Sequence, residues 1–484
     1  MKKLRRGAWF LALLCCFGLM AGGAALAAEE TISADSTIKP GVYIETVDVA
    51  GMTAQEARQA VEAHMQDLAD TWIQIAFGEE VETITFADLE LTWTNPEVID
   101  EALIYGNTGN VLERYKAVRN LENESVILDL EYTWKENLLR DYMEQQAEAR
   151  HTDPVEATLV RDNKAKEFVI TESVTGVDVD VAASVEAVCD AIGMEWNGEE
   201  VYVDAVMQYT APRLTTEQAM LVTDCLGEYE TTYNAAEIDR SENLRVACNY
   251  INGVVLMPGE SLSFFDYLYP VTAERGYREA TAYQGGRYID SLGGGLCQVS
   301  TTCYNAVLLA ELEVLERTQH SMTVSYVKPG LDSGQAWSSG RNLNFANNTE
   351  YPVYVEAHLY TNRYGTSFVY IGLWGKETRP ENRTVKYDSE YTEEWPYAGQ
   401  PVITFDPNKP YYEWERTQGE YPKVYAMAYK YVYIDGKLES KTPLYEKQDY
   451  YRPTPAYWTV GTGGMTQEEF LASIHEDVVF MPPY

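Results

Sequence analysis

The sequence predicts a multidomain α+β protein. Its 484 residues are enough for about three domains, because one domain commonly contains roughly 100–200 residues. Residues 40–212 alternate short β-strand patterns with amphipathic helix patterns, whereas residues 376–460 contain 14 tyrosines and are predicted to form mainly strands. Hydrophobic residues make up 45% of the chain, which is sufficient for packed cores and excludes a largely disordered protein.

The first 28 residues have the pattern of an export signal. Basic residues at the start are followed by an apolar run from Ala8 to Leu19, and Ala25-Leu26-Ala27 fits a cleavage site. We therefore expect a secreted protein of the extracellular space or cell envelope. The alternative is that residues 8–28 remain as a membrane anchor, although the run is short for a span of about 20 residues.

The acidic composition limits the classes of partner. The formal net charge is −38, and the predicted signal contributes four positive and no negative charges to it. Clusters of Lys and Arg bind nucleic acids and anionic lipids, so we expect neither as a partner. The sequence contains no EF-hand loop and no zinc-spaced group of His and Cys. We therefore expect no metal and no other cofactor.

Residues 40–212 are predicted to form two diverged copies of one α+β unit. The first copy contains a strand, a turn at Gly51 and a helix capped by Thr53, with Glu56 completing a capping box. The second copy repeats the strand–turn–helix order in residues 176–193. Two helical stretches join the copies: residues 97–118 and 134–149.

Three consecutive glycines precede a helix that opens with a cysteine. Gly293, Gly294 and Gly295 permit a positive φ or a close approach of another backbone. Cys297 follows at the helix start, where free N–H groups and the helix dipole favour a thiolate. An apolar stripe along the same helix, which is expected to end near residue 312, places Cys303 on the buried face as an inert thiol.

The five cysteines beyond the predicted signal do not form a disulfide framework. An odd number leaves at least one thiol free or paired with another chain. A Cys225–Cys248 bridge is one possibility, whereas Cys297 and Cys303 are six residues apart on one helix and point to different faces. Cys189 is the fifth member of the set.

A nucleophilic cysteine needs a base and a group that orients the base. We predict that His320 begins a strand beside Cys297 and that Asp332, twelve residues later, fixes its tautomer. Papain-like and transglutaminase-like folds present the same order of cysteine, histidine and acid, which is an analogy of topology. The alternative is that the thiol only packs, that His320 binds a backbone carbonyl and that Asp332 is a turn residue.

Five segments resemble the VanW family in their order and spacing: "PGESLSF", "GGGLCQVST", "YNAVLLA", "ERTQHSMTVSYVKPGLD" and "NNTEYPVYV". This family takes its name from a vancomycin-resistance gene cluster, and the resemblance implies a VanW domain over residues 213–375. The opening "GVYIETVDVAGMTAQEA" resembles the YoaR-like peptidoglycan-binding domain of Gram-positive envelope proteins. That resemblance implies that residues 40–212 bind cell-wall peptide or glycan.

Residues 376–484 are predicted to form a tyrosine-rich β module. Tyr425, Tyr429, Tyr431 and Tyr433 share one face of a strand with period two, which is typical of a half-buried sheet face. Alternatively, the last three form a platform on which sugars stack. The segment "YYRPTPAYWTVGTG" resembles the G-five family of surface modules, which implies binding of amino sugars.

These observations predict an exported envelope protein that binds peptidoglycan or its precursors through the YoaR-like and VanW domains. Besides the three glycines, Gln298 and Arg317 are candidate ligand-binding residues, and Arg317 pairs either with a wall-peptide carboxylate or with an acid of this chain. One alternative is a cysteine amidase, peptidase or transpeptidase that uses Cys297, His320 and Asp332. Another is a non-catalytic, glycan-binding adaptor. An enzyme requires Cys297 to be free and accessible, whereas an adaptor tolerates its burial.

Overall fold

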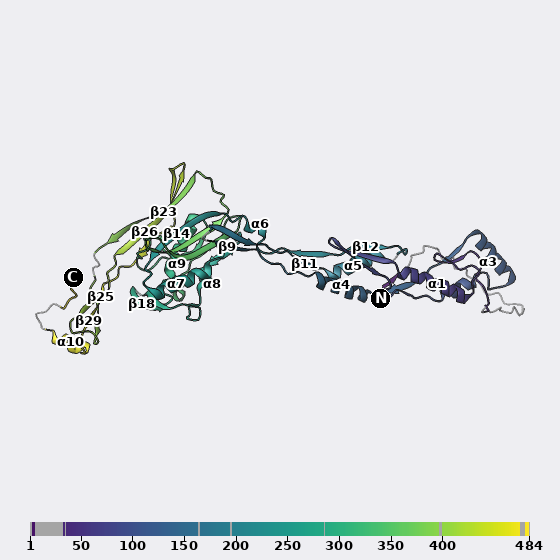
Figure 1. Cartoon of the computed structure of the whole chain (residues 1–484), viewed down its shortest axis with the longest axis horizontal. Helices are drawn as coiled ribbons and strands as arrows, with labels where there is room; N and C mark the ends of the chain where they lie inside the picture. Colours follow the sequence, from purple (N-terminus) through teal and green to yellow (C-terminus); the bar gives the residue numbers. More distant parts are fainter. Residues whose placement is uncertain are drawn as a thin grey trace, which may run out of the picture. The chain divides into compact units, whose positions relative to one another are not determined.

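The computed structural model describes residues 2–4, 32–33, 35–162, 165–193, 196–284, 286–395, 399–474 and 480–483. They form two compact units (Figure 1). The first unit comprises Met1–Val155 and Val174–Pro212, and the second comprises Glu156–Ser173 and Arg213–Tyr484. Both units combine helices with several small sheets, which confirms the predicted multidomain α+β class.

The predicted export signal lies outside the described residues, apart from the short strand β1 (Lys2–Leu4). Within the described ranges, no helix has both the length and the apolar character that a membrane crossing requires.

The first unit consists of small sheets and five helices in the described residues. Its sheets have the strand orders β12-β4-β5, β3-β2-β7, β1-β8-β6 and β11-β13. The helices are α1 (Ala54–Ala69), α2 (Val98–Ile104), α3 (Val111–Asn123), α4 (Glu136–Arg150) and α5 (Val181–Ile192). The further strands are β2 (Val42–Ile44), β3 (Val47–Asp48), β4 (Trp72–Phe77), β5 (Glu80–Thr85), β6 (Thr92–Trp93), β7 (Val126–Leu128), β8 (Tyr132–Trp134), β11 (Gly176–Val179), β12 (Val201–Asp204) and β13 (Met207–Thr210).

The start of α1 confirms the predicted capping box. The Thr53 hydroxyl accepts from the Glu56 N–H at 3.3 Å, and the Glu56 carboxylate accepts from the Thr53 N–H at 2.9 Å. These two bonds satisfy N–H groups that have no partner inside the helix. The strands β4 and β5 form a hairpin around Gly78, since they pair as antiparallel neighbours.

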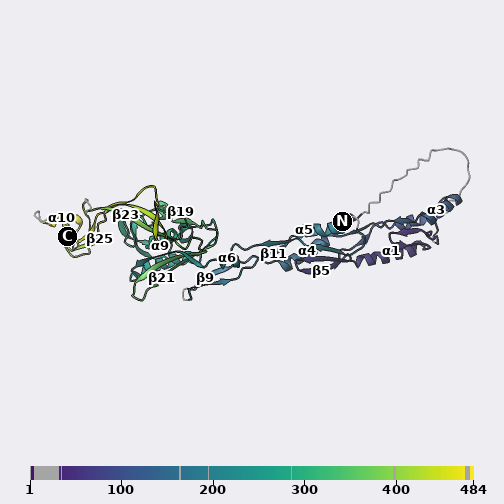
Figure 2. The same cartoon turned by 90° about the horizontal axis from the view of Figure 1, so that it is seen from above.

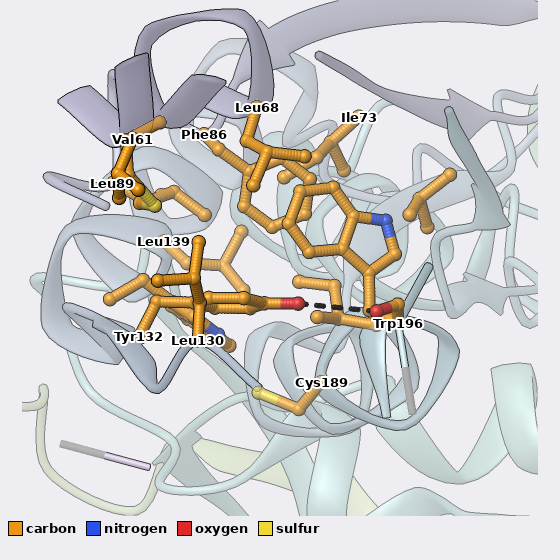
Figure 3. Packing of buried hydrophobic residues seen from close by; sticks show 14 of the residues in the cluster. Val61, Leu68, Ile73, Phe86, Leu89, Leu130, Tyr132, Leu139, Cys189 and Trp196 are labelled. Atoms are coloured by element: carbon orange, nitrogen blue, oxygen red, sulfur yellow. Dashed lines mark hydrogen bonds between the residues drawn. The ribbon is translucent and has the colours of Figure 1, made fainter. Parts of the chain in front are cut away.

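The two predicted copies of the α+β unit share one hydrophobic core. Strand β12, which follows the second copy's helix, pairs in parallel with β4 of the first copy. In the core, the rings of Phe86 and Trp196 stack with centroids 3.9 Å apart, and the Tyr132 hydroxyl donates to the Trp196 carbonyl at 3.2 Å (Figure 3). Burial of these aromatic rings joins segments that are more than a hundred residues apart in sequence.

The second unit contains the cysteine-led helix. Its helices in the described residues are α6 (Thr216–Ala219), α7 (Ile238–Ile251), α8 (Phe264–Leu268), α9 (Leu296–Ala310), the 3-10 helix η1 (Trp337–Ser339) and α10 (Gln467–Ser473). Its strands up to residue 375 are β9 (Thr158–Asp162), β10 (Glu167–Thr171), β14 (Asp224–Tyr233), β15 (Val255–Leu256), β16 (Ser261–Ser263), β17 (Glu279–Gln284), β18 (Arg287–Leu292), β19 (Glu313–Glu316), β20 (Asn344–Ala346), β21 (Val353–Thr361) and β22 (Ser367–Gly375).

A four-stranded antiparallel sheet, in the order β14-β22-β21-β15, supports α7 and α9 (Figure 1 and Figure 2). Helix α9 packs against β14 and β22, and α7 packs against β21 and α9. Gly227 of β14 permits this packing, because a Cβ atom there would lie 2.3 Å from the backbone nitrogen of Ala310. The hairpin β9–β10 also belongs to this unit, where Leu159 shares a small core with Val222 and Tyr354.

The C-terminal part of the second unit forms two further sheets. The first has the order β23-β26-β27, with β28 also paired to β26, and the second has the order β24-β29-β25. Val424, Ala426 and Ala428 of β26 are buried, while the alternating tyrosines occupy the opposite, half-buried face as predicted. The strands are β23 (Arg383–Glu394), β24 (Val402–Asp406), β25 (Trp414–Gln418), β26 (Lys423–Ile434), β27 (Lys437–Pro443), β28 (Asp449–Tyr451) and β29 (Tyr457–Gly461).

Substitution of Phe86 by Ala tests the core of the first unit. Phe86 is fully buried, so we expect the Phe86→Ala variant to lose about 3–5 kcal/mol of the free energy of unfolding of this unit, measured by urea denaturation. Trp72→Ala serves as the control, because Trp72 is 51% exposed and its loss should change stability by no more than about 0.5 kcal/mol. Equal effects of the two substitutions would contradict the assignment of Phe86 to the core.

Candidate active site

The glycine turn before α9 has the conformation that only glycine adopts readily. Gly293 has φ of 78° and Gly295, the N-cap of α9, has φ of 115°. Gly294 is required for a different reason, since a Cβ atom there would lie 2.3 Å from the carbonyl oxygen of Ala280. The turn therefore places Cys297 in the first turn of α9, where helix N–H groups lack intrahelical partners.

The expected strand from His320 onward is not present. Strand β19 ends at Glu316, and residues 317–330 form an irregular loop. The His320 N–H donates to the Asp332 Oδ2 atom at 2.7 Å, and the Gly334 N–H donates to the Thr318 carbonyl at 2.7 Å. These local bonds take the place of a strand ladder, because each backbone group can satisfy its hydrogen bonding within the loop.

His320 and Asp332 form a buried pair. The Nδ1 atom of His320 lies 2.6 Å from Oδ2 of Asp332, and neither side chain is more than 6% exposed. Burial alone would raise the pKa of Asp332, but the hydrogen bonds and charge of His320 and the charge of Arg317 outweigh it and hold this pKa well below its usual range. Asp332 therefore remains a carboxylate that orients the imidazole.

The thiol of Cys297 interacts with the same imidazole. Burial alone would lower the pKa of His320, but its bonds to Asp332 and Cys297 outweigh burial and raise the pKa to about 10. For Cys297, burial alone would raise the pKa. Three groups together outweigh burial and lower it: His320, the N–H of Gln335 and the charge of Arg240. Among the described residues, His320 Nε2 has no hydrogen-bond partner of regular geometry. Catalytic hydrogen bonds are often long or poorly aligned before a substrate binds, and here a loose hydrogen bond and the opposite charges together join the thiol and the ring.

Gln335 contacts the thiol and was not anticipated from the sequence. Its backbone N–H donates to Sγ of Cys297 at 3.3 Å. Gln335 as a whole is 8% exposed, and neither Nε2 nor Oε1 of its buried amide has a hydrogen-bond partner within the described part of the chain. An unpaired buried amide is costly, so this group is available to a ligand. No sequence pattern marks it, because a lone glutamine in a loop has no characteristic spacing.

A cavity of about 370 Å³ adjoins the thiol. Its lining includes the three glycines, Cys297, Gln298 and Gln335, together with residues of the hairpin β17–β18. Cys297 is only partly buried, whereas Cys303 is fully buried in the core, as predicted. Gln298 is 2% exposed, and its Nε2 atom donates to the Thr231 hydroxyl at 3.0 Å, so it fixes α9 to β14 at the cavity's base.

Arg317 contacts Asp332 and is not among the residues that line the cavity. Its guanidinium donates to the Asp332 carbonyl at 2.7 Å, to Asp332 Oδ1 at 3.2 Å and to Asp449 Oδ2 at 2.7 Å. The hydroxyl of Tyr451 also donates to Asp332 Oδ1. The sequence left two partners open for Arg317, a wall-peptide carboxylate or an acid of this chain. The structure shows acids of this chain. Residues of β28, in the predicted tail module, thus complete the surroundings of Asp332.

The remaining predicted residues lie elsewhere. Tyr429 and Tyr431 are neighbours on β26 with ring centroids 6.4 Å apart, and the Lys441 Nζ atom lies 4.1 Å from the Tyr429 ring. Tyr433 is half-buried on the same strand, and none of the three lines the cavity. Cys225 and Cys248 are both free thiols, so the considered Cys225–Cys248 bridge does not form. No group of three or more His, Cys, Asp or Glu suited to a metal ion occurs in the described ranges.

Residues 239–369 match the family model "VanW like protein". Residues 82–197 match the model "Putative peptidoglycan binding domain". The protein YoaR of Bacillus subtilis is 34% identical over 159 residues, which cover 33% of this chain and 51% of YoaR. The "Vancomycin B-type resistance protein VanW" of Enterococcus faecalis is 27% identical over 135 residues, which cover 28% of this chain and 47% of that protein. The chain spans about half the length of these curated relatives.

Two solved G5-domain structures also show similarity. The structure titled "Crystal structure of HP0197-G5" has 18% identity and a TM-score of 0.10, covering 16% of this chain and 97% of that one. The structure titled "IgA1 Protease G5 domain structure" has 15% identity and a TM-score of 0.11, covering 16% of this chain and 92% of that one.

The two family-model matches, "VanW like protein" and "Putative peptidoglycan binding domain", confirm the expected resemblances and relate the chain to proteins of the cell wall.

The lowered pKa of Cys297 predicts a distinctive pH dependence of alkylation. The thiolate forms as the pH rises through this lowered pKa, while His320 stays protonated until about pH 10. We expect iodoacetamide to reach its full rate at Cys297 at a lower pH than at Cys225, whose thiol pKa is raised to about 12 by desolvation of its sulfur atom and by the charge of Glu228. Peptide mass spectrometry across a pH series measures both rates in one sample.

Removal of the His320 imidazole tests what lowers the pKa of Cys297. In the His320→Asn variant the positive charge is absent, so the midpoint of Cys297 alkylation should move upward towards the ordinary thiol value of about 8.5. The Cys225 profile should not move. An unchanged Cys297 midpoint in a folded variant would show that His320 does not stabilise the thiolate.

Proposed function

We propose that the chain is an exported cell-envelope protein that binds peptidoglycan and cleaves or transfers an acyl bond of wall peptides with Cys297. The observation that carries this proposal is the chain of contacts from thiol to imidazole to buried carboxylate beside an open cavity. A thiol that served only for packing would need neither a charged imidazole nor an adjoining cavity. The family matches supply the class of substrate, since one concerns peptidoglycan binding and the other VanW-like proteins.

The arrangement supports nucleophilic catalysis in two steps. The Cys297 thiolate attacks the carbonyl carbon of an amide, which forms a C–S bond and moves the carbonyl π electrons onto oxygen. Collapse of this intermediate breaks the C–N bond, and the His320 imidazolium gives its proton to the leaving amine. Water or a second amine then attacks the carbonyl carbon of the thioester, and His320 takes the attacking group's proton. The C–S bond breaks, which releases the acyl group and restores the Cys297 thiolate. Water gives hydrolysis, and an amine gives transpeptidation.

Gln335 is suited to stabilise the charge that develops on the carbonyl oxygen. Its side-chain amide is buried, unpaired among the described residues and part of the cavity lining beside Sγ. The backbone N–H of Cys297, in the first turn of α9, offers a second donor at the positive end of the helix dipole. A preorganised pair of donors is the usual device for an oxyanion in acyl transfer.

The first unit is the proposed wall-binding part. It contains residues 82–155 and 174–197 of the region that matches the peptidoglycan-binding model, and that match is the basis of the assignment; residues 156–173 of the match belong to the second unit. Export through the predicted signal would deliver the chain to this substrate, with retention of residues 8–28 as an anchor being the alternative.

The Cys297→Ala variant tests catalysis directly. Incubation of the protein with purified wall sacculi should release new peptide fragments or cross-links detectable by mass spectrometry, and Cys297→Ala should abolish them while leaving binding to sacculi intact. Cys225→Ala is the matched control, because Cys225 is exposed and does not line the cavity. Binding without any change in the sacculi, for wild type and variant alike, would favour the non-catalytic adaptor.

The Gln335→Ala variant tests oxyanion stabilisation. Loss of one such donor typically lowers kcat by about 10²–10³-fold, so we expect that reduction with a smaller change in KM. Alkylation of Cys297 by iodoacetamide should proceed as in the wild type, because the backbone N–H of Gln335 remains. A kcat within twofold of the wild-type value would assign the side chain no role in the transition state.

A further inference from the structure

The cavity beside Cys297 has one charged residue among its described lining residues, Arg240. Arg240 lies in the first turn of α7, and its side chain is 20% exposed. Apart from the Cys297 thiol, which ionises at its lowered pKa, every other lining residue described is neutral, although the whole chain contains 75 acidic and only 37 basic residues. A guanidinium in this position gives the cavity a positive character within a strongly acidic protein.

The guanidinium of Arg240 is held mainly by neutral oxygen atoms. It donates to Gln298 Oε1 at 2.9 Å and, at the limit of hydrogen bonding, to the Thr281 carbonyl at 3.5 Å. Its one ion pair within the described ranges is with Glu237, which lies 3.7 Å from Nε and is itself half-exposed, and such solvated pairs contribute little. By contrast, Arg317 contacts two buried carboxylates at 2.7 and 3.2 Å. Arg240 therefore retains capacity for a carboxylate from outside the chain.

Arg240 and the start of α9 face the same space. A Cβ atom on Gly295, the N-cap of α9, would lie 3.4 Å from Cγ and 3.6 Å from Nη1 of Arg240. A Cβ atom there would be in ordinary van der Waals contact with Arg240, so the N-cap of α9 and the guanidinium lie side by side. The positive end of the helix dipole and the guanidinium charge then act on one anion together.

We propose that this cavity takes an acyl substrate that carries a free carboxylate near the scissile carbonyl, and that Arg240 binds this carboxylate. The inference rests on the proposed acyl-transfer function of Cys297 and adds the class of substrate. Guanidinium binds carboxylate through two parallel N–H···O bonds, which fixes the orientation of the group as well as its position. Arg240 is then a specificity-determining residue, and amides without a neighbouring carboxylate are poor substrates.

Two alkylating reagents of nearly the same size test the inference without a known substrate. Iodoacetate and iodoacetamide both react when the thiolate displaces iodide from carbon, but only iodoacetate carries a carboxylate. Both rates depend equally on the nucleophilicity of the Cys297 thiolate, including any contribution of Arg240 to it. The ratio of the two rates is therefore independent of that nucleophilicity. We expect this ratio in the full-length protein to exceed that of glutathione, and Arg240→Gln to lower it about ten- to hundredfold.

Arg278→Gln is the matched control. Arg278 is exposed, pairs with Asp239 at 3.0 Å and does not line the cavity, so its removal changes the net charge equally and should leave the ratio unchanged. Arg240→Lys should retain part of the preference, since the charge remains without the bidentate geometry. Acetyl-alanine should also protect Cys297 from iodoacetamide better than acetyl-alaninamide does.

The possible outcomes separate the two proposals. A rapid reaction of Cys297 with iodoacetamide, combined with the same rate ratio in wild type and Arg240→Gln, would overturn the carboxylate site and leave the acyl-transfer proposal standing. A Cys297 that reacts with neither reagent at neutral pH in the folded protein would overturn both. A ratio that falls equally in Arg278→Gln would reduce the preference to the general charge of the surface and overturn the specific role of Arg240.

Discussion

The buried carboxylate of Asp332 is the interaction on which the second unit's site depends. It accepts hydrogen bonds from the backbone and ring of His320, from Arg317 and from the hydroxyl of Tyr451. A carboxylate without such partners would be very costly to bury, and removal of a partner from a buried ion pair commonly costs about 3–5 kcal/mol. The same bonds that pay this desolvation cost determine the tautomer and orientation of His320. Stability and chemistry therefore rest on one set of contacts.

The loop around Asp332 is also tied to the helix that carries the thiol. Ser333 follows Asp332, and its carbonyl accepts from the hydroxyls of Ser300 at 2.7 Å and Thr301 at 3.1 Å. Both hydroxyls lie on α9, one turn beyond Cys297. Because α9 also packs against β14 and β22, the acid, the base and the thiol are all held in place by the same sheet. A shift of the sheet would move all three together and would not separate them.

Local patterns in the sequence predicted the elements whose cause is local. The capping box of Thr53 and Glu56, the period-two tyrosines of β26 and the buried stripe of α9 all follow from spacing over a few residues. The strand expected at His320 failed because an alternation of residue types does not reveal that a carboxylate twelve residues away binds the backbone N–H. Gln335 and Arg240 escaped notice because their positions depend on how separate elements meet around the cavity. The contact of Tyr451 with Asp332 joins residues 119 positions apart, and no local signal encodes it.

The strand β28 lies outside the segment that matches the VanW-like model, which ends at residue 369, yet it supplies Tyr451 and Asp449 to the surroundings of Asp332. The match and the physical unit therefore have different boundaries. In evolution, recombination could not exchange the C-terminal strands independently of the rest of the unit. A new C-terminal segment would have to place a hydroxyl donor where Tyr451 lies and a carboxylate where Asp449 lies. Covariation between the loop at 317–332 and residues 449–451 is the trace that this dependence would leave among related chains.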